Sequence, residues 1–206
     1  MKIIPTIIAK NQEEFNELFL RYKNLFKTIQ IDIMDGKFVK NKSNLFNIKL
    51  PKTHKFEAHL MINNPEDYIY KNYKKFDIII ANFEKVKNPK KLIEFIKNKK
   101  KKIGFALNPE TSIMHLNPYL KNLDKILILT VHPGEYGAEF VKESLEKISM
   151  LRIIYKKDIE VDGHINEKTI KLCKKSGATS FAVGSYFKNS KNLKKDLNKL
   201  NNNFGA

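Results

Sequence analysis

The stretch Gln30–Val39, QIDIMDGKFV, combines a strand pattern with a turn signal. Gln30, Asp32 and Met34 share one face of the expected strand, isoleucines occupy the other face, and an aspartate-glycine pair ends the run. In an antiparallel sheet with one face in water, this alternation is ordinary. In a closed parallel barrel it would aim the polar side chains at an active-site mouth, because functional groups lie at the carboxyl ends of barrel strands.

Strand-like and helix-like segments alternate along the whole chain. Apolar runs with strand character lie at residues 2–8, 28–34, 54–61, 77–83, 102–107, 124–131, 158–162 and 179–184. Segments with helical periodicity lie at residues 11–26, 64–76, 88–100, 108–123, 138–157, 166–177 and 189–200. Several of the helical segments open with Asn-Pro, which is typical of an N-cap followed by proline in the first turn.

This alternation predicts parallel strands joined by right-handed crossovers. Only the connection at residues 37–53 is poorly helical. We therefore predict an α/β fold in which residues 1–206 form a single (β/α)8 TIM barrel domain. An open doubly wound sheet is the alternative, because strand count alone does not establish closure.

The charge of the chain is strongly positive but evenly spread. The 206 residues carry a formal net charge of +17, and only Arg21 and Arg152 are arginines. Nucleic-acid binders more often gather arginine with aromatic side chains on one face, so we expect solvated lysines and no nucleic-acid partner. No apolar run approaches the roughly 20 residues of a membrane helix, so we expect no membrane partner and a cytoplasmic protein. The single cysteine, Cys173, lies in a helical segment and is expected to be a buried thiol.

Polar side chains gather where the expected strands end. Asp32, His59 and Asp162 come from the second, third and seventh strands and could converge as N/O ligands of a divalent cation. A spacing of two places Gln30 on the face of Asp32 and Met61 on the face of His59. Each residue alone is also explained as a satisfied polar group or a cap, so the evidence is their repeated placement at one end.

Glycine-bearing loops follow the last three strands, in HPGEYGAEF, DGHIN and VGSYF. Glycine lets backbone N–H groups approach an anion, and barrels hold phosphate in the loops after the seventh and eighth strands. Glycine also simply ends strands, so the clustering of the three loops carries the argument. The sequence therefore predicts a phosphate site.

In order and spacing, the segments IIPTII, IDIMDGKFV, IGFALNPETS, TVHPG and EVDGHI resemble the ribulose-phosphate 3-epimerases, and the match covers essentially the whole chain. The resemblance implies a barrel of the ribulose-phosphate-binding type. It implies an isomerase of the pentose phosphate pathway that interconverts D-ribulose 5-phosphate and D-xylulose 5-phosphate by 1,1-proton transfer. A pentulose 5-phosphate is then the substrate, and the protein is expected to be a homo-oligomer.

The same resemblance assigns roles to individual residues. Asp32 and Asp162 match the acid/base pair on opposite faces of the substrate. Asp32, His59 and Asp162, with Gln30, match the ligands of a divalent metal such as Zn, Fe, Mn or Co, which stabilises the enediolate. The positions that match substrate contacts are Thr6, Met34, His59, Met61, Gly134, Gly137, Gly163, His164, Gly184 and Ser185.

Several positions depart from the family pattern, and three of them bear on the metal, the phosphate and the loop over the substrate. Gln30 stands where the family has a metal-binding histidine, and an amide oxygen is a poorer ligand for zinc-like metals. His164 replaces a glycine in the phosphate region, and Tyr136 alters the loop over the substrate. Either His164 takes over part of the ligand or phosphate role, or the metal site has decayed. In the second case the barrel would act on another ketose phosphate or bind a sugar phosphate without catalysis.

Overall fold

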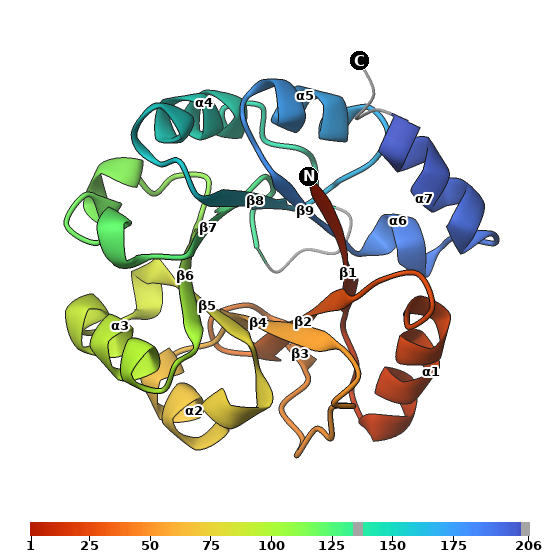
Figure 1. Cartoon of the computed structure of the whole chain (residues 1–206), viewed down its shortest axis with the longest axis horizontal. Coiled ribbons are helices and arrows are strands. Elements are labelled where there is room, and N and C mark those ends of the chain that lie inside the picture. The colour runs from red at the N-terminus through yellow and green to blue at the C-terminus, as the bar shows by residue number, and fades with distance from the viewer. Residues whose placement is uncertain (134–137, 203–206) are drawn as a thin grey trace.

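In the computed structural model, which describes residues 1–133 and 138–202, the strands close into a barrel with helices around it (Figure 1). The parallel strands are β1 (Lys2–Ile7), β2 (Thr28–Asp35), β4 (Lys55–Met61), β5 (Ile78–Asn82), β6 (Lys102–Leu107), β7 (Lys125–Leu129), β8 (Asp158–Asp162) and β9 (Ser180–Val183). They pair in the order β1-β9-β8-β7-β6-β5-β4-β2, and β1 pairs again with β2. That last pairing, with Thr6 opposite Gln30, closes the barrel. The predicted TIM barrel is confirmed, and the open sheet is wrong.

Helices follow most of the strands and cover the outside of the barrel (Figure 1). The α-helices are α1 (Gln12–Tyr22), α2 (Pro65–Asn72), α3 (Pro89–Asn98), α4 (Ser144–Ile154), α5 (Thr169–Lys175), α6 (Ser185–Lys188) and α7 (Leu193–Asn202). Short 3-10 turns η1 (Tyr73–Lys75), η2 (Phe83–Lys85), η3 (Ile113–Leu116) and η4 (Leu120–Asn122) complete the connections.

The Asn-Pro signal correctly predicts two helix starts, because α2 begins at Pro65 and α3 at Pro89, but only one of these asparagines makes a side-chain cap bond. Asn88 caps α3 because its Oδ1 accepts the Lys91 N–H at 3.0 Å. Asn64 before α2 has a left-handed backbone (φ 52°) and makes no side-chain cap bond. The predicted helix at 108–123 is wrong, since only η3 and η4 form there. Pro118 explains the break, because proline inside a helix removes a hydrogen bond and clashes with the preceding turn.

The connection at residues 37–53 is not helical, as expected, but it contains a short strand that the pattern did not predict. This strand, β3 (Lys42–Ser43), runs antiparallel to the end of β2. Ser43 Oγ and Asn44 Nδ2 both donate to the Asp32 carbonyl, at 2.6 and 2.8 Å. The connection therefore fixes the backbone of β2 at Asp32.

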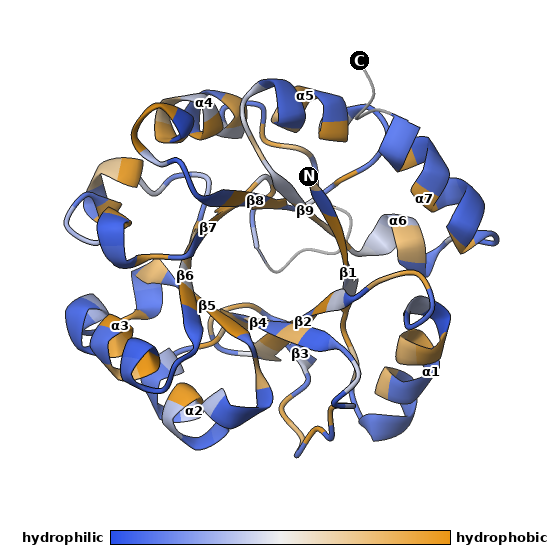
Figure 2. Ribbon diagram, in the orientation of Figure 1, coloured by the Kyte–Doolittle hydropathy of each residue, from blue (hydrophilic) through white to orange (hydrophobic). Residues whose placement is uncertain are grey.

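The outward faces of the strands pack under the helices. Ile31 and Ile33 alternate with Asp32 because they lie on this outward face, whereas Asp32 points into the barrel. Both isoleucines have no exposed surface and belong to the main core with α1 residues such as Phe15. Burying one such side chain contributes about 1.5–3 kcal/mol. A smaller apolar group of Ile80, Ala106, Leu127 and Leu129 forms a separate cluster. Figure 2 shows largely hydrophobic strands inside a ring of helices that carry both hydrophilic and hydrophobic residues.

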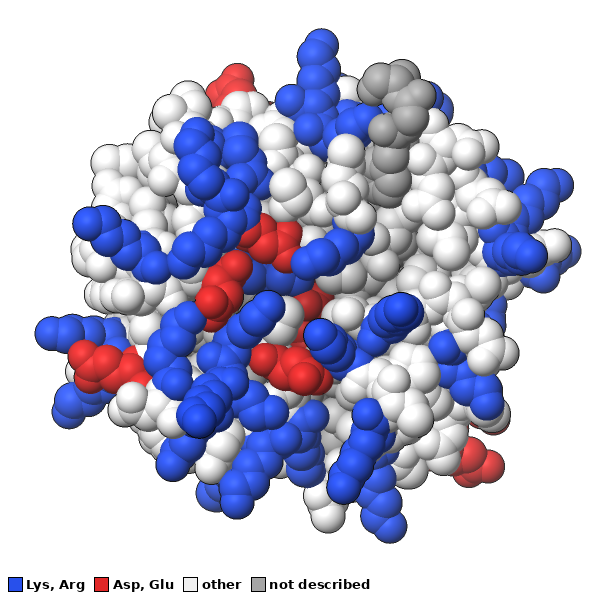
Figure 3. All heavy atoms as spheres, viewed as in Figure 1, with Lys and Arg blue, Asp and Glu red and all other residues white. Residues whose placement is uncertain are grey.

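Charged side chains are spread over the surface. Figure 3 shows Lys and Arg side chains at many places on one face of the molecule, with acidic side chains between them near its centre. Some lysines are paired, as Lys97 is with Asp124 at 2.6 Å. Cys173 is buried, as expected, and burial raises the pKa of its thiol to about 12. Within the described ranges, no helix is long and apolar enough to cross a membrane.

Candidate active site

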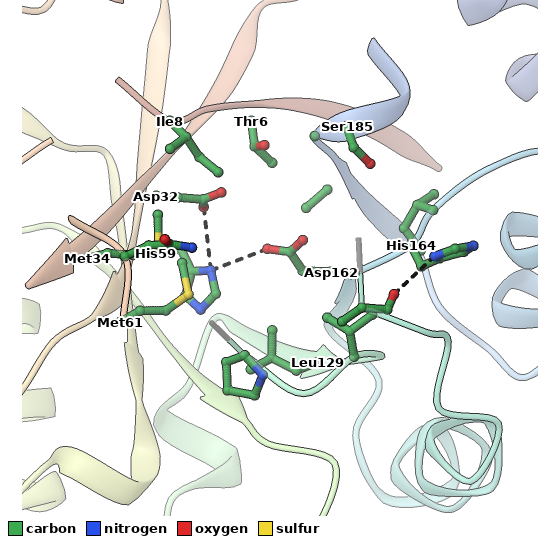
Figure 4. Close-up of a pocket in the computed structure, with 18 of the residues that line it drawn as sticks. Thr6, Ile8, Asp32, Met34, His59, Met61, Leu129, Asp162, His164 and Ser185 are labelled. Carbon is green, nitrogen blue, oxygen red and sulfur yellow. Dashed lines mark hydrogen bonds and ion pairs between the residues drawn. The ribbon is translucent and has the colours of Figure 1, made fainter. Parts of the chain in front are cut away.

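Asp32, His59 and Asp162 meet at the carboxyl ends of three barrel strands (Figure 4). Asp32 on β2 and His59 on β4 are register partners, and Asp162 is the last residue of β8. One ligand atom from each side chain lies within 4.8 Å of the other two. His59 Nδ1 is 3.3 Å from Asp162 Oδ2 and 3.6 Å from Asp32 Oδ1. The structure therefore brings together three N/O donors that the sequence places far apart.

Gln30 lies beneath this cluster and joins its two acids. Its Nε2 donates to Asp32 Oδ1 at 2.8 Å and to Asp162 Oδ2 at 2.9 Å. The side chain is fully buried, and its Oε1 has no hydrogen-bond partner among the described residues. A single amide nitrogen thus connects carboxylates on β2 and β8, which are not neighbours in the barrel.

The electrostatics of the cluster favour a cation. Burial lowers the pKa of His59, but its contacts with Asp162 and Asp32 outweigh burial and raise that pKa to about 10. Burial also raises the pKa of Asp32, an effect that His59 partly offsets. Without a metal, the two carboxylates therefore retain a proton on the imidazole between them.

These residues also fit a divalent metal. Two carboxylates and one imidazole are donors that Zn²⁺ and similar ions accept. Both ring nitrogens of His59 are buried: Nδ1 has only its ion-pair contacts with the two carboxylates, and Nε2 has no hydrogen-bond partner among the described residues. A metal bound there would replace the proton on His59 and would satisfy a buried ring nitrogen.

A cavity of about 160 Å³ opens above the cluster. One part of its wall is apolar and contains Met34 and Met61, which are nearly buried and pack with Val39. The polar part includes Thr6 and Ser185 (Figure 4). The cavity thus places an apolar surface and hydrogen-bonding groups around the acids.

The predicted phosphate residues Gly163, Gly184 and Ser185 line the same cavity. Gly184 has to be small, because a Cβ there would lie 2.8 Å from Thr6 Oγ1. Ser185 is the first residue of α6. The other two predicted glycines, Gly134 and Gly137, and the departure at Tyr136 lie outside the described residues.

His164 lies at the rim of the cavity and is not part of the three-residue cluster. Its Nδ1 donates to the Ala138 carbonyl at 3.1 Å, and its ring points away from Asp162 (Figure 4). The backbone is left-handed here (φ 52°), a conformation that costs an L-residue roughly 1–2 kcal/mol. His164 therefore has a backbone form that is more usual for glycine, while its imidazole is directed to the Ala138 carbonyl.

A second charged group fills the barrel, and the sequence analysis missed it. Lys125 Nζ contacts Glu57 Oε2 at 2.7 Å and also contacts Glu160 Oε2, and all three residues are buried. Asp158 Oδ2 lies 3.7 Å from the same ammonium group. Burial lowers the pKa of Lys125, but Glu160 and Glu57 outweigh it and raise that pKa.

The sequence did contain a signal for this group. Glu57 precedes His59 by two residues and Glu160 precedes Asp162 by two, so each shares a strand face with a site residue. The period of two that places Gln30 on the face of Asp32 also places these glutamates inside the barrel.

Comparisons with known proteins agree with this geometry. The sequence model described as "Ribulose-phosphate 3 epimerase family" matches residues 2–188. A ribulose-phosphate 3-epimerase from Chlamydia muridarum is 34% identical over 183 residues, which cover 82% of this chain and 80% of that protein. One from Bacillus subtilis is 31% identical over 212 residues, which cover 97% of this chain and 98% of that protein.

Solved structures share the fold at lower identity. A mutant tryptophan synthase α-subunit from Pyrococcus furiosus matches with a TM-score of 0.70 and 15% identity, covering 100% of this chain and 98% of that one. This likeness shows the barrel alone. The family match over nearly the whole chain, together with relatives above 30% identity, is specific: the chain belongs to the ribulose-phosphate 3-epimerase family.

Proposed function

We propose that the protein is a ribulose-phosphate 3-epimerase, an isomerase that interconverts D-ribulose 5-phosphate and D-xylulose 5-phosphate. The observation that carries the proposal is the approach of Asp32 and Asp162 to one imidazole at the floor of a cavity. Inversion at a carbon next to a ketone needs a base on one face of that carbon and an acid on the other. Two carboxylates from separate strands supply such a pair.

In the proposed mechanism, one carboxylate removes the C3 proton and the other returns a proton to the opposite face. Asp32 and Asp162 exchange these roles when the reaction runs in reverse. Met34 and Met61 pack on the reacting carbons and exclude water from them. Gly163, Gly184 and Ser185 bind the phosphate, with His164 at the rim beside them, and the Thr6 hydroxyl binds the sugar. Gly134 and Gly137 belong to the loop over the substrate.

A divalent cation held by Asp32, His59 and Asp162 would supply positive charge beside the substrate oxygens on which negative charge develops. The donor set suits Zn, Fe, Mn or Co. The proposal also includes the homo-oligomeric state that the family resemblance implies and the cytoplasmic location expected from the short apolar runs.

The test combines turnover with isotope exchange. Purified protein is incubated in D₂O with ribulose 5-phosphate and, separately, each of Zn²⁺, Fe²⁺, Mn²⁺ and Co²⁺. We expect xylulose 5-phosphate to form with deuterium at C3. A folded protein that gives neither product nor exchange with any of these metals would refute the proposal, whereas turnover of a different ketose phosphate alone would change the substrate.

A further inference from the structure

Gln30 uses both hydrogens of its side-chain amide on the two acids of the site. A primary amide nitrogen has two N–H donors, and here one goes to Asp32 Oδ1 and the other to Asp162 Oδ2. Both contacts, at 2.8 and 2.9 Å, are typical of strong bonds to an ionised acceptor.

The opposite orientation of this amide is unfavourable. Turning it would bring Oε1 against the same two carboxylate oxygens, and an oxygen cannot donate to either. Because Gln30 has no exposed surface, water cannot relieve that repulsion. The amide nitrogen has no lone pair available for a metal, and the oxygen, the only ligand atom, lies on the other end of the group.

The remaining donors are sufficient for a catalytic metal. Asp32, His59 and Asp162 form a three-residue N/O set within 4.8 Å. Three protein ligands leave a coordination position for substrate, as in other catalytic metal sites.

We propose that Gln30 is a positioning residue that holds Asp32 and Asp162 through its side-chain N–H₂, both with and without metal, and that it is not a metal ligand. The effect of Gln30 on catalysis rests on the proposed function, whereas its hydrogen bonds and its absence from the metal ligands do not. The glutamine that replaces the family histidine then orients the acid/base pair toward the substrate, and the metal centre has three protein ligands.

The chain offers a matched control for this proposal, because Gln12 and Gln30 are its only glutamines. The Gln12 amide also makes two donor contacts, to Asn16 Oδ1 at 2.8 Å and to the Lys49 carbonyl at 3.2 Å, but at the surface. Protein labelled with ¹⁵N at the glutamine side chains should therefore give two pairs of amide proton signals. The signals are assigned from the variants Gln12→Leu and Gln30→Leu, because each variant lacks one pair.

We expect the Gln30 amide protons to exchange with solvent much more slowly than those of Gln12, and to stay protected when Zn²⁺ saturates the site. A crystal structure of the zinc-loaded protein should keep the Gln30 nitrogen within hydrogen-bond distance of both carboxylates. Loss of protection on adding zinc, or a Gln30 Oε1 at about 2.0–2.2 Å from the zinc ion, would overturn the proposal.

Two further measurements separate positioning from ligation. In Gln30→Leu we expect one zinc per chain to remain, while kcat falls about 10–100-fold and KM changes less. Gln12→Leu should leave the zinc content and kcat unchanged.

A folded Gln30→Leu protein that no longer binds zinc would contradict the proposal. If Gln30→Leu does not fold, the exchange rate of the Gln30 amide protons and the zinc-bound structure of the unaltered protein decide whether Gln30 is a ligand. If the unaltered protein lacks epimerase activity, the proposed function fails, while amide exchange and zinc content still decide the role of Gln30.

Discussion

His59 lies fully buried between two carboxylates, and this arrangement predicts how the stability of the metal-free protein depends on pH. Its pKa is raised from 6.5 to about 10 by Asp162 and Asp32 acting against burial. A raised pKa stabilises the fold fully below pH 6.5, and the stabilisation is lost as the pH rises through 10. Between these values the free energy of unfolding should fall by an amount on the order of a few kcal/mol.

The measurement is thermal unfolding of chelator-treated protein from pH 6.5 to 10. The unaltered protein should melt at steadily lower temperatures as the pH increases. The His59→Gln variant lacks the titrating group and should show a much smaller decrease. If the melting temperature fell equally with pH in the two proteins, the imidazole would not hold the proton between the acids.

The two acids predict a further result at the residue scale. With Asp162→Asn or Asp32→Asn, one face of the substrate loses its acid/base group, so interconversion should fall by about 10²–10⁴-fold. The remaining carboxylate can still remove and return a proton on its own face. Each variant should therefore incorporate deuterium into one epimer only, without inverting it, as NMR of the recovered sugar phosphates would show. Residual inversion equal in both variants would contradict a two-base mechanism.

At the scale of elements, Asp35 joins the ends of β2 and β4. Its Oδ1 accepts the N–H groups of Lys37 and Phe38 at 2.8 and 2.9 Å, and its Oδ2 accepts that of Asn63 at 2.8 Å. Burial would raise the pKa of Asp35, but these backbone bonds outweigh it and lower that pKa. The aspartate-glycine pair read as a turn is therefore also a connection between two site-bearing strands.

Asp35→Ala should destabilise the protein by about 2 kcal/mol, because three backbone donors lose a charged acceptor. Urea unfolding at pH 7 measures the change. Asp35→Asn serves as the control and should lose less, since an amide oxygen still accepts. An alanine variant as stable as the unaltered protein would mean that water replaces the carboxylate without cost.

The elements were predicted best where the pattern is local. The eight barrel strands appear where the apolar runs are, because a period of two and β-branched residues are properties of the segment itself. The segment at 108–123 failed because its apolar spacing is helical while Pro118 prevents a helix. The short β3 strand was missed because it depends on the end of β2, with which it pairs.

At the scale of the whole molecule, the group of Lys125, Glu57 and Glu160 ties β7, β4 and β8 together inside the barrel. Burial of this group is tolerated because the ammonium offsets carboxylate charge, and because burial and Glu57 raise the pKa of Glu160 well above its usual value. Lys125→Met leaves two carboxylates buried without a cation, and should destabilise the protein by about 3–5 kcal/mol.

The matched control is the triple variant Lys125→Met, Glu57→Leu, Glu160→Leu, which removes the charges together. It should recover most of the stability lost in the single variant, because no buried glutamate is left without its cation. Asp158, the other carboxylate near Lys125, keeps its contacts with the hydroxyl groups of Thr179 and Ser180. Denaturant unfolding at pH 7 compares the three proteins. A triple variant less stable than the single variant would show that the ion pairs stabilise the barrel beyond mutual compensation.

The sequence by itself determined the order of the strands and the face on which each side chain lies. Alternation at a period of two follows from strand geometry within a few residues, so Gln30 with Asp32 and His59 with Met61 could be paired without coordinates. Family motifs added the expected roles of Asp32 and Asp162.

Only the tertiary structure decided that β1 pairs with β2 and closes the barrel. Only it showed the Gln30 amide bridging to Asp162, 132 residues away, and Lys125 meeting Glu57 inside the barrel. These contacts depend on which strands lie across the barrel from one another and on which end of a side chain faces its partner. Neither is a property of any local segment, so neither could be obtained from spacing along the chain.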